Sequence, residues 1–327
     1  MFAHVISGGV SFQYASFLAM PSWFSPEVFW PYCAGIVVLA FGLPRIFSKD
    51  LPHAHGLDKL LALGPLFFAI TMAAFGAQHF TLGRFVARMV PSWIPWHLFW
   101  IYFVGTALIA AALSIVTRNQ ARLSASLLGL MLFLFVVLMH IPTLLNKPYD
   151  RIQLAVVLRD LAFSGGALAF AGMQTDAWRV NGKHVLITIA RFFIAIPVLV
   201  FAVEQFLHPD FVPGVPLAKE TPLWIPAHVL WSYLGAIVYL PAGLALILNK
   251  QARLVATWLG IVILLIVLFI YLPIEIASPA DIGNALNYFV DTLAFAGTVL
   301  ILASALPAEP FAASRKSIKV TANYQGF

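Results

Sequence analysis

Nine segments of about 20 mostly apolar residues follow one another along this chain of 327 residues. A helix needs about 20 apolar residues to cross a bilayer core of about 30 Å. The segments lie at about 28–47, 60–80, 95–116, 122–142, 152–173, 184–206, 224–248, 252–273 and 281–305. This pattern predicts an all-α polytopic membrane protein, in which no strand is needed.

The composition excludes a soluble protein. Hydrophobic residues make up 61% of the chain and charged residues 10%, so too few polar side chains remain to cover soluble domains. The single cysteine, Cys33, has no partner for an intrachain disulfide. In a soluble protein a net charge of +6 would suggest nucleic-acid binding. Here membrane topology accounts for the basic residues, so we expect membrane lipids as partners and no nucleic acid.

Basic residues predict the orientation of the chain, because loops rich in Lys and Arg stay in the cytoplasm. The first 27 residues contain neither, so we expect the N-terminus outside, with Phe12, Tyr14, Phe17 and Trp23 in an interfacial segment. This choice places 13 of the 19 basic residues inside, whereas Arg84, Arg88, Lys147, Arg151, Arg159 and Lys219 lie outside or in the outer leaflet. The tail 307–327 is then a basic cytoplasmic extension.

An internal repeat gives the domain organisation. Pro91, Trp93, Ile94, Pro95, His97, Trp100 and Tyr102 recur 131 residues later as Pro222, Trp224, Ile225, Pro226, His228, Trp231 and Tyr233. Over 91–142, 19 of 52 positions are identical at this shift without a gap. We therefore expect four spans in 60–176 and four in 177–306, after an extra span in 1–59. An even number of spans gives both copies the same orientation, as two tandem parallel four-helix bundles.

Two aspartates are the strongest functional signal, because an ionisable group inside a transmembrane helix is costly. Asp160 and Asp291 occupy equivalent positions, about 12–15 Å inside their helices. Helical spacing predicts one polar stripe of Gln153, Asp160 and Ser164 and another of Asn284, Asn287 and Asp291, each facing a bundle interior. Alternatively, the acids are structural, each hydrogen bond contributing about 1 kcal/mol. Arg159 is a candidate partner for Asp160 in the first copy only.

Further polar residues converge on the outer half of the membrane and predict a polar cavity in each bundle. They are Gln78, His79, His97 and His140 in the first copy and Glu204, Gln205, His228 and Tyr271 in the second, with Glu275 just beyond. His97 and His228 follow the interfacial W-I-P motif, so interfacial structure explains them better than proton transfer or ligand binding does.

Haem would need two histidines on facing helices at similar depth. His97 with His140 or His79 fits this geometry, but no full set recurs in the second copy, and haem is not expected. No metal site is predicted. The absence of GxGxxG, Walker, HExxH and CxxC motifs leaves nucleotide binding, zinc proteolysis and disulfide exchange without support.

Three motifs together resemble the DoxX family of small bacterial membrane proteins. They are a helix ending in F-x-x-x-H-F at 75–80, the segment P-S-W-I-P at 91–95 and the turn R-N-Q-A-R-L at 118–123. The resemblance spans about 60–306, and the duplication and the extra first span depart from the family's single four-helix unit. It implies a four-helix bundle in the bacterial inner membrane and an association with quinone-dependent electron transfer. It implies no catalytic residues.

The sequence thus leads to two functional hypotheses. The first is an accessory subunit of a quinone-linked respiratory or redox assembly that binds a lipophilic ligand, with quinone as the candidate, in outer-leaflet cavities. The second is a proton-coupled transporter of a small solute. The candidate ligand or proton sites are Asp160, Asp291, His97, His228, His140, Glu204, Gln78, His79, Asn284 and Asn287.

Overall fold

The computed structural model describes residues 25–176, 179–180, 183–215 and 217–307. Within this part of the chain, nine helices are long and apolar enough to cross a membrane. The prediction of an all-α polytopic membrane protein is confirmed, and the helix bounds lie within a few residues of those expected. The N-terminal interfacial segment and the basic tail beyond residue 307 lie outside the described residues.

The helices of the nine spans are α1 (Pro26–Arg45), α3 (Gly64–Thr81), α5 (His97–Thr117), α6 (Ala121–Phe135), α8 (Arg151–Met173), α9 (Val185–Leu207), α10 (His228–Leu248), α11 (Ala252–Ile266) and α13 (Asn287–Ala305). Wider π-helical turns extend four of these helices. Three follow their helix: η3 (Ile46–Asp50) follows α1, η6 (Val136–His140) follows α6 and η7 (Val267–Tyr271) follows α11. The fourth, η8 (Ile282–Leu286), precedes α13. Short helices complete the chain: η4 (Leu51–His53), α2 (Asp58–Leu61), α4 (Gly83–Val86), η5 (Ala87–Met89), α7 (Ile141–Asn146) and α12 (Leu272–Ala277).

The connection between α8 and α9 contains two short strands that the sequence did not predict. β1 (Arg179–Val180) pairs antiparallel with β2 (Lys183–His184). The Asn-Gly pair in the sequence between them is typical of hairpin turns, and two residues per strand are too few to produce an apolar alternation. The hairpin reverses the chain outside the membrane-spanning region.

Local backbone conformations recur at the spacing of the sequence repeat. The six non-glycine residues with positive φ in the described chain form three pairs that are 131 residues apart: Trp96 and Ala227, Arg118 and Asn249, Gln120 and Gln251. The π-turns η6 and η7 and the helices α7 and α12 correspond in the same way. Because α5 and α10 begin at His97 and His228, Pro95 and Pro226 directly precede the two helices.

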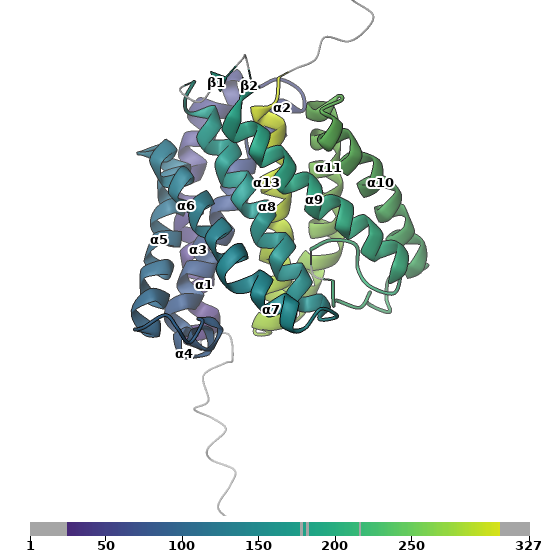
Figure 1. Ribbon diagram of the computed structural model, residues 1–327. Helices are drawn as coiled ribbons and strands as arrows, with labels where there is room; N and C mark the ends of the chain where they lie inside the picture. Colours follow the sequence, from purple (N-terminus) through teal and green to yellow (C-terminus); the bar gives the residue numbers. More distant parts are fainter. Residues whose placement is uncertain (1–24, 177–178, 181–182, 216, 308–327) are drawn as a thin grey trace, which may run out of the picture.

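Helices of the two copies interlock at the centre of the molecule. Neighbouring helices pack in the order α3, α5, α6, α8 in the first copy and α9, α10, α11, α13 in the second. In addition, α8 packs against α9, α13 packs against α3, and α8 and α13 pack against each other (Figure 1). The first helix of each set therefore packs against the fourth helix of the other set. The extra helix α1 lies against α3 and α5.

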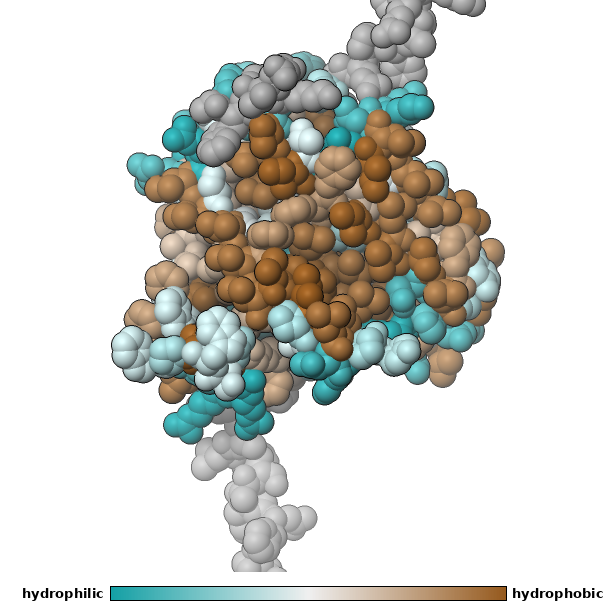
Figure 2. Space-filling model, viewed as in Figure 1, coloured by the Kyte–Doolittle hydropathy of each residue, from teal (hydrophilic) through white to brown (hydrophobic). Residues whose placement is uncertain are grey.

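The hydropathy of the surface and the burial of the spans agree with this packing of the helices. On the face shown in Figure 2, a broad apolar band covers the middle of the molecule, with polar residues towards both ends. Of the nine spans, those containing α13 and α8 are the most buried, whereas the span Ala121–Asn146 is the least buried. We call the two ends the hairpin end, with α2, β1 and β2, and the α7 end, with α4, α7 and α12 (Figure 1).

Glycines allow the interlocked helices to approach closely. A Cβ atom on Gly297 of α13 would lie 2.7 Å from the carbonyl oxygen of Gly64 and 2.7 Å from the amide nitrogen of Phe68, both on α3. On the other side, a Cβ atom on Gly165 of α8 would lie 2.9 Å from the carbonyl oxygen of Ala190 on α9. Small residues at such crossings let transmembrane helices pack backbone to backbone.

We expect Gly297→Ala to destabilise the protein by about 1–3 kcal/mol, because its methyl group would separate two backbones that cannot yield locally. The measurement is the midpoint of thermal unfolding in mild detergent. Gly35→Ala on α1 is the matched control, since its Cβ would meet only Ile70 Cγ2 at 3.4 Å. Equal midpoints for both variants would contradict the close crossing.

Candidate functional site

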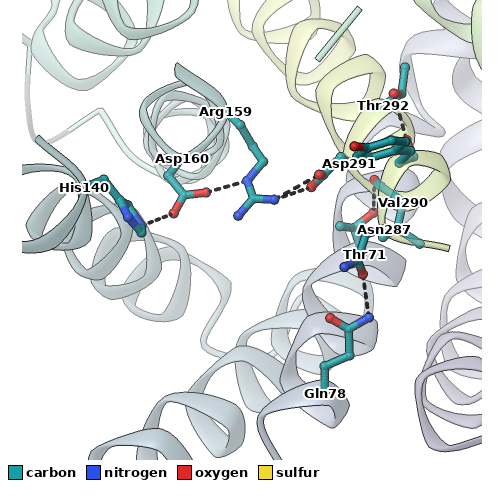
Figure 3. A network of polar contacts seen from close by, with 10 residues as sticks. Thr71, Gln78, His140, Arg159, Asp160, Asn287, Val290, Asp291 and Thr292 are labelled. Carbon is teal, nitrogen blue, oxygen red and sulfur yellow. Dashed lines mark hydrogen bonds and ion pairs between the residues drawn. The ribbon is translucent and has the colours of Figure 1, made fainter. Parts of the chain in front are cut away.

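The site lies where α8 and α13 cross, and its centre is Arg159. The guanidinium donates from Nε to Asp160 Oδ1 at 3.0 Å, and from Nη1 to Asp291 Oδ1 at 3.0 Å and Oδ2 at 2.9 Å. The carboxylate side chains are only 10% and 7% exposed, respectively. One arginine thus binds two aspartates from equivalent positions of the repeat (Figure 3).

The sequence predicted only half of this arrangement. Arg159 was expected as a partner of Asp160, although neighbouring residues on a helix point about 100° apart. The Arg159 side chain is long enough to reach the Asp160 carboxylate despite that angle. The bond to Asp291 was missed, because it depends on the direct packing of α8 against α13. The position equivalent to Arg159 in α13 is Val290, so the repeat supplies two acids but a single arginine.

His140, from the first helix set, is a further partner of Asp160. It is the last residue of η6, and its Nε2 lies 3.0 Å from Asp160 Oδ2. Two carboxylates and one guanidinium leave a net charge of −1 when His140 is neutral, and a proton on His140 makes the group neutral. We call His140, Arg159, Asp160 and Asp291 the charge cluster.

Hydrogen bonds between the two helix sets flank the charge cluster. Gln78 near the end of α3 donates from Nε2 to Asn287 Oδ1 on α13 at 2.7 Å (Figure 3). At the equivalent end of α9, Glu204 Oε2 accepts from Nε of Arg151 on α8 at 3.0 Å. In both copies the first helix is therefore bonded to the fourth helix of the other set.

A cavity of about 530 Å³ opens beside the charge cluster at the α7 end. Its lining is Arg88, Met89, Met139, His140, Thr143, Ile152, Gln153, Ala155, Val156, Arg159, Val215, Leu217, Ala218, Gly283, Asn287, Tyr288 and Asp291. These residues come from both helix sets, so the cavity is shared. The two acids were expected in separate cavities, and this expectation is corrected, because the fourth helices cross and bring the acids of both copies to one place.

Of the stripe residues, Gln153 lines this cavity and donates to the carbonyl oxygen of His140 at 3.3 Å. Ser164 is fully buried and donates to the carbonyl oxygen of Gly129 at 2.7 Å. Asn287, one turn before Asp291, also lines the cavity. These residues face the interior as expected.

Asn284 does not join the site. It is exposed and hydrogen-bonds to Asp281, because the π-turn η8 rotates it away from the face of Asp291 that regular α-helical spacing predicts. Its backbone amide donates to Asp281 Oδ1 at 2.9 Å and holds the pKa of that carboxyl below its usual value. Asp281 thus caps the element that leads into α13, as Asp150 caps α8.

The other predicted residues also lie apart from the charge cluster. His97 and His228 are half-buried at the starts of α5 and α10, and His228 lies 4.0 Å from Asp210. His79 contacts the carbonyl oxygen of Phe75 through Nδ1 at 2.7 Å. Glu204 belongs to the separate pair with Arg151. Among the described residues, no group of three or more His, Cys, Asp or Glu side chains is arranged to hold a metal ion.

Two features of the site carried no sequence signal. Arg88 and Tyr288 line the cavity although neither belongs to a motif. Tyr32 of α1 donates a hydrogen bond to the buried Glu275 of α12. The extra first helix therefore contacts the second helix set at the α7 end.

Comparison of the chain with models of known protein families, with curated proteins and with solved structures finds no match. The resemblance to the DoxX family therefore depends on the three sequence motifs alone.

We expect Arg159→Met to destabilise the protein by about 3–5 kcal/mol, because it leaves two buried carboxylates without their cation. Adding Asp291→Asn to this variant should restore part of the loss, since the one remaining carboxylate keeps His140 as its partner. Thermal unfolding in mild detergent measures both effects.

Arg88→Met is the control for this experiment, because Arg88 lines the same cavity from the exposed turn η5. It should change the midpoint little. Equal losses in Arg159→Met and Arg88→Met, or no recovery in the double variant, would contradict the bridging role of Arg159.

Proposed function

We propose that this protein binds a lipophilic ligand with a polar head group in the shared cavity. The observation that carries the proposal is the composition of the cavity wall. Arg159, Gln153 and Asp291 offer hydrogen-bond donors and acceptors, whereas side chains such as Met89 and Met139 are apolar. Apolar walls with a few convergent polar groups are typical of small-molecule sites.

The dimensions of the cavity support a ligand of moderate size. Its volume of about 530 Å³ lies within the range of about 300–1,000 Å³ that is usual for such sites. A quinone head group presents two carbonyl oxygens that accept hydrogen bonds, and the reduced form presents two hydroxyl groups. Arg159 and Gln153 suit the first form, and a carboxylate such as Asp291 suits the second.

Quinone is the ligand that the DoxX resemblance suggests, and it makes an accessory subunit of a respiratory or redox assembly the best-supported role. The corresponding location is the bacterial inner membrane. Arg45, Lys49, Lys59, Lys250 and Arg253 lie in or beside the elements that meet at the hairpin end, so the positive-inside rule favours a cytoplasmic hairpin end and an outer α7 end. In this orientation the cavity is reached from the outer leaflet.

Gly283→Trp tests the ligand site. The position lines the cavity, and the nearest atom to an added Cβ is Asp281 Oδ1 at 3.8 Å, so a side chain can begin there without a backbone clash. We expect the purified wild-type protein to retain quinone and to bind a short-chain quinone in a fluorescence titration. Gly283→Trp should weaken that binding at least about tenfold, because a side chain occupies the ligand's volume.

Ile276→Trp is the matched control, since this α12 side chain is 71% exposed on the outer surface. It should bind the quinone like the wild type. Wild-type protein that neither retains nor binds quinone would overturn the quinone assignment, and equal binding by both tryptophan variants would place the ligand elsewhere.

The net charge of the charge cluster favours a second candidate, proton-coupled transport of a small solute. With one guanidinium for two carboxylates, the cluster can accept a proton as part of a transport cycle. Against this, the core between the cluster and the hairpin end is filled by side chains such as Phe163, Phe170 and Phe295, all of which are at most 1% exposed. Proteoliposomes with an internal pH dye distinguish the two: a transporter moves protons with its solute, whereas a binding subunit does not.

A further inference from the structure

A second group of polar side chains lies within the second helix set, apart from the cavity wall. It consists of Gln205 on α9, Tyr239 on α10 and Tyr271 in η7, which are 3%, 0% and 1% exposed, respectively. We call these three residues the inner polar site. None of them lines the shared cavity.

The polar atoms of the inner polar site have no protein partner. Among the described residues, none hydrogen-bonds to Gln205 Nε2, Gln205 Oε1 or the hydroxyl groups of Tyr239 and Tyr271. Thr292 lies near Tyr271, but its hydroxyl donates to the carbonyl oxygen of Tyr288 at 2.9 Å. Buried polar groups in folded proteins almost always have a partner, because leaving one unpaired is costly. Four such atoms on three helical elements of the second set point to a bound molecule.

Two glycines lie against the polar groups of the inner polar site. A Cβ atom on Gly235 of α10 would lie 2.6 Å from Gln205 Oε1, so only glycine leaves room for the amide there. Tyr239 follows Gly235 by one helical turn and shares its face. A Cβ atom on Gly214 would lie 3.8 Å from the Tyr271 hydroxyl. Both glycines therefore border the polar groups of the site.

The repeat relates the inner polar site to the charge cluster. Tyr271 corresponds to His140, and the carboxylates that these residues approach, Asp291 and Asp160, also correspond. His140 bonds directly to Asp160, whereas Tyr271 lies within electrostatic range of Asp291 without a direct hydrogen bond. A small molecule between Tyr271 and Asp291 would supply the missing connection.

We propose that the inner polar site binds water and that this water extends the hydrogen-bond network of Asp291 into the second helix set. An uncharged ligand matches the groups of the inner polar site itself, because one amide and two hydroxyl groups carry no formal charge. It must both donate and accept hydrogen bonds to satisfy these groups. A buried water makes about three hydrogen bonds, so about two waters satisfy the four atoms.

Tyr239→Phe and Tyr271→Phe test the proposal, because each removes one hydroxyl and keeps the shape of the ring. If water binds there, each variant loses a hydrogen bond, and we expect the midpoint of thermal unfolding to fall by about 2–4 °C. If the hydroxyls are unpaired, their removal relieves a penalty, and the midpoint rises or stays unchanged. Tyr233→Phe, 38% exposed on α10, is the control and should leave the midpoint unchanged.

X-ray hydroxyl-radical footprinting of the wild-type protein supplies an independent readout. Bound water generates radicals in place, so Tyr239 and Tyr271 should be labelled at rates approaching that of Tyr149, which is 95% exposed. Labelling as slow as that of the fully buried Phe68 and Phe295 would overturn the proposal, as would a midpoint that both variants raise or leave unchanged.

Discussion

The ion pairs of Arg159 with two aspartates link the two halves of this molecule through their most buried spans. Charged groups inside a membrane are tolerated when they neutralise one another, and a guanidinium can bind two carboxylates through separate donors. Asp160 and Asp291 would each be costly alone on its helix. The contact between α8 and α13 makes them acceptable, so the position of these two helices and the cavity beside them depend on this interaction.

The sequence correspondence between the two helix sets accounts for the paired aspartates of the site and for its single arginine. The repeat supplies an aspartate on each fourth helix, and the interlocked packing brings both to one place. The residue equivalent to Arg159 in the second copy is Val290, which is buried against Ala74 of α3. One copy therefore carries the cation, and the surroundings differ accordingly, with His140 beside Asp160 and Tyr271 near Asp291. The two halves form one site that neither half contains alone.

Much of the fold could be predicted from the sequence, because hydropathy and spacing are local properties. The nine spans and the depth of the two acids follow from segment length alone. The contacts between helices depend on residues that are far apart in the sequence. The sequence gives no sign that α3 packs against α13, so the bond between Gln78 and Asn287 and the second partner of Arg159 were out of reach. Asn284 was misplaced because a π-turn leaves no pattern in composition.

The interlocked packing also constrains the order in which the protein can assemble. A ribosome releases α8, with Arg159 and Asp160, well before it reaches Asp291 on α13. Until then the helix crosses the membrane with an arginine that has only one carboxylate, and α3 lacks its neighbour. Without α13, the first set of helices thus leaves the polar side of α8 and one side of α3 without their neighbour. Synthesis of the last helix closes both halves at once.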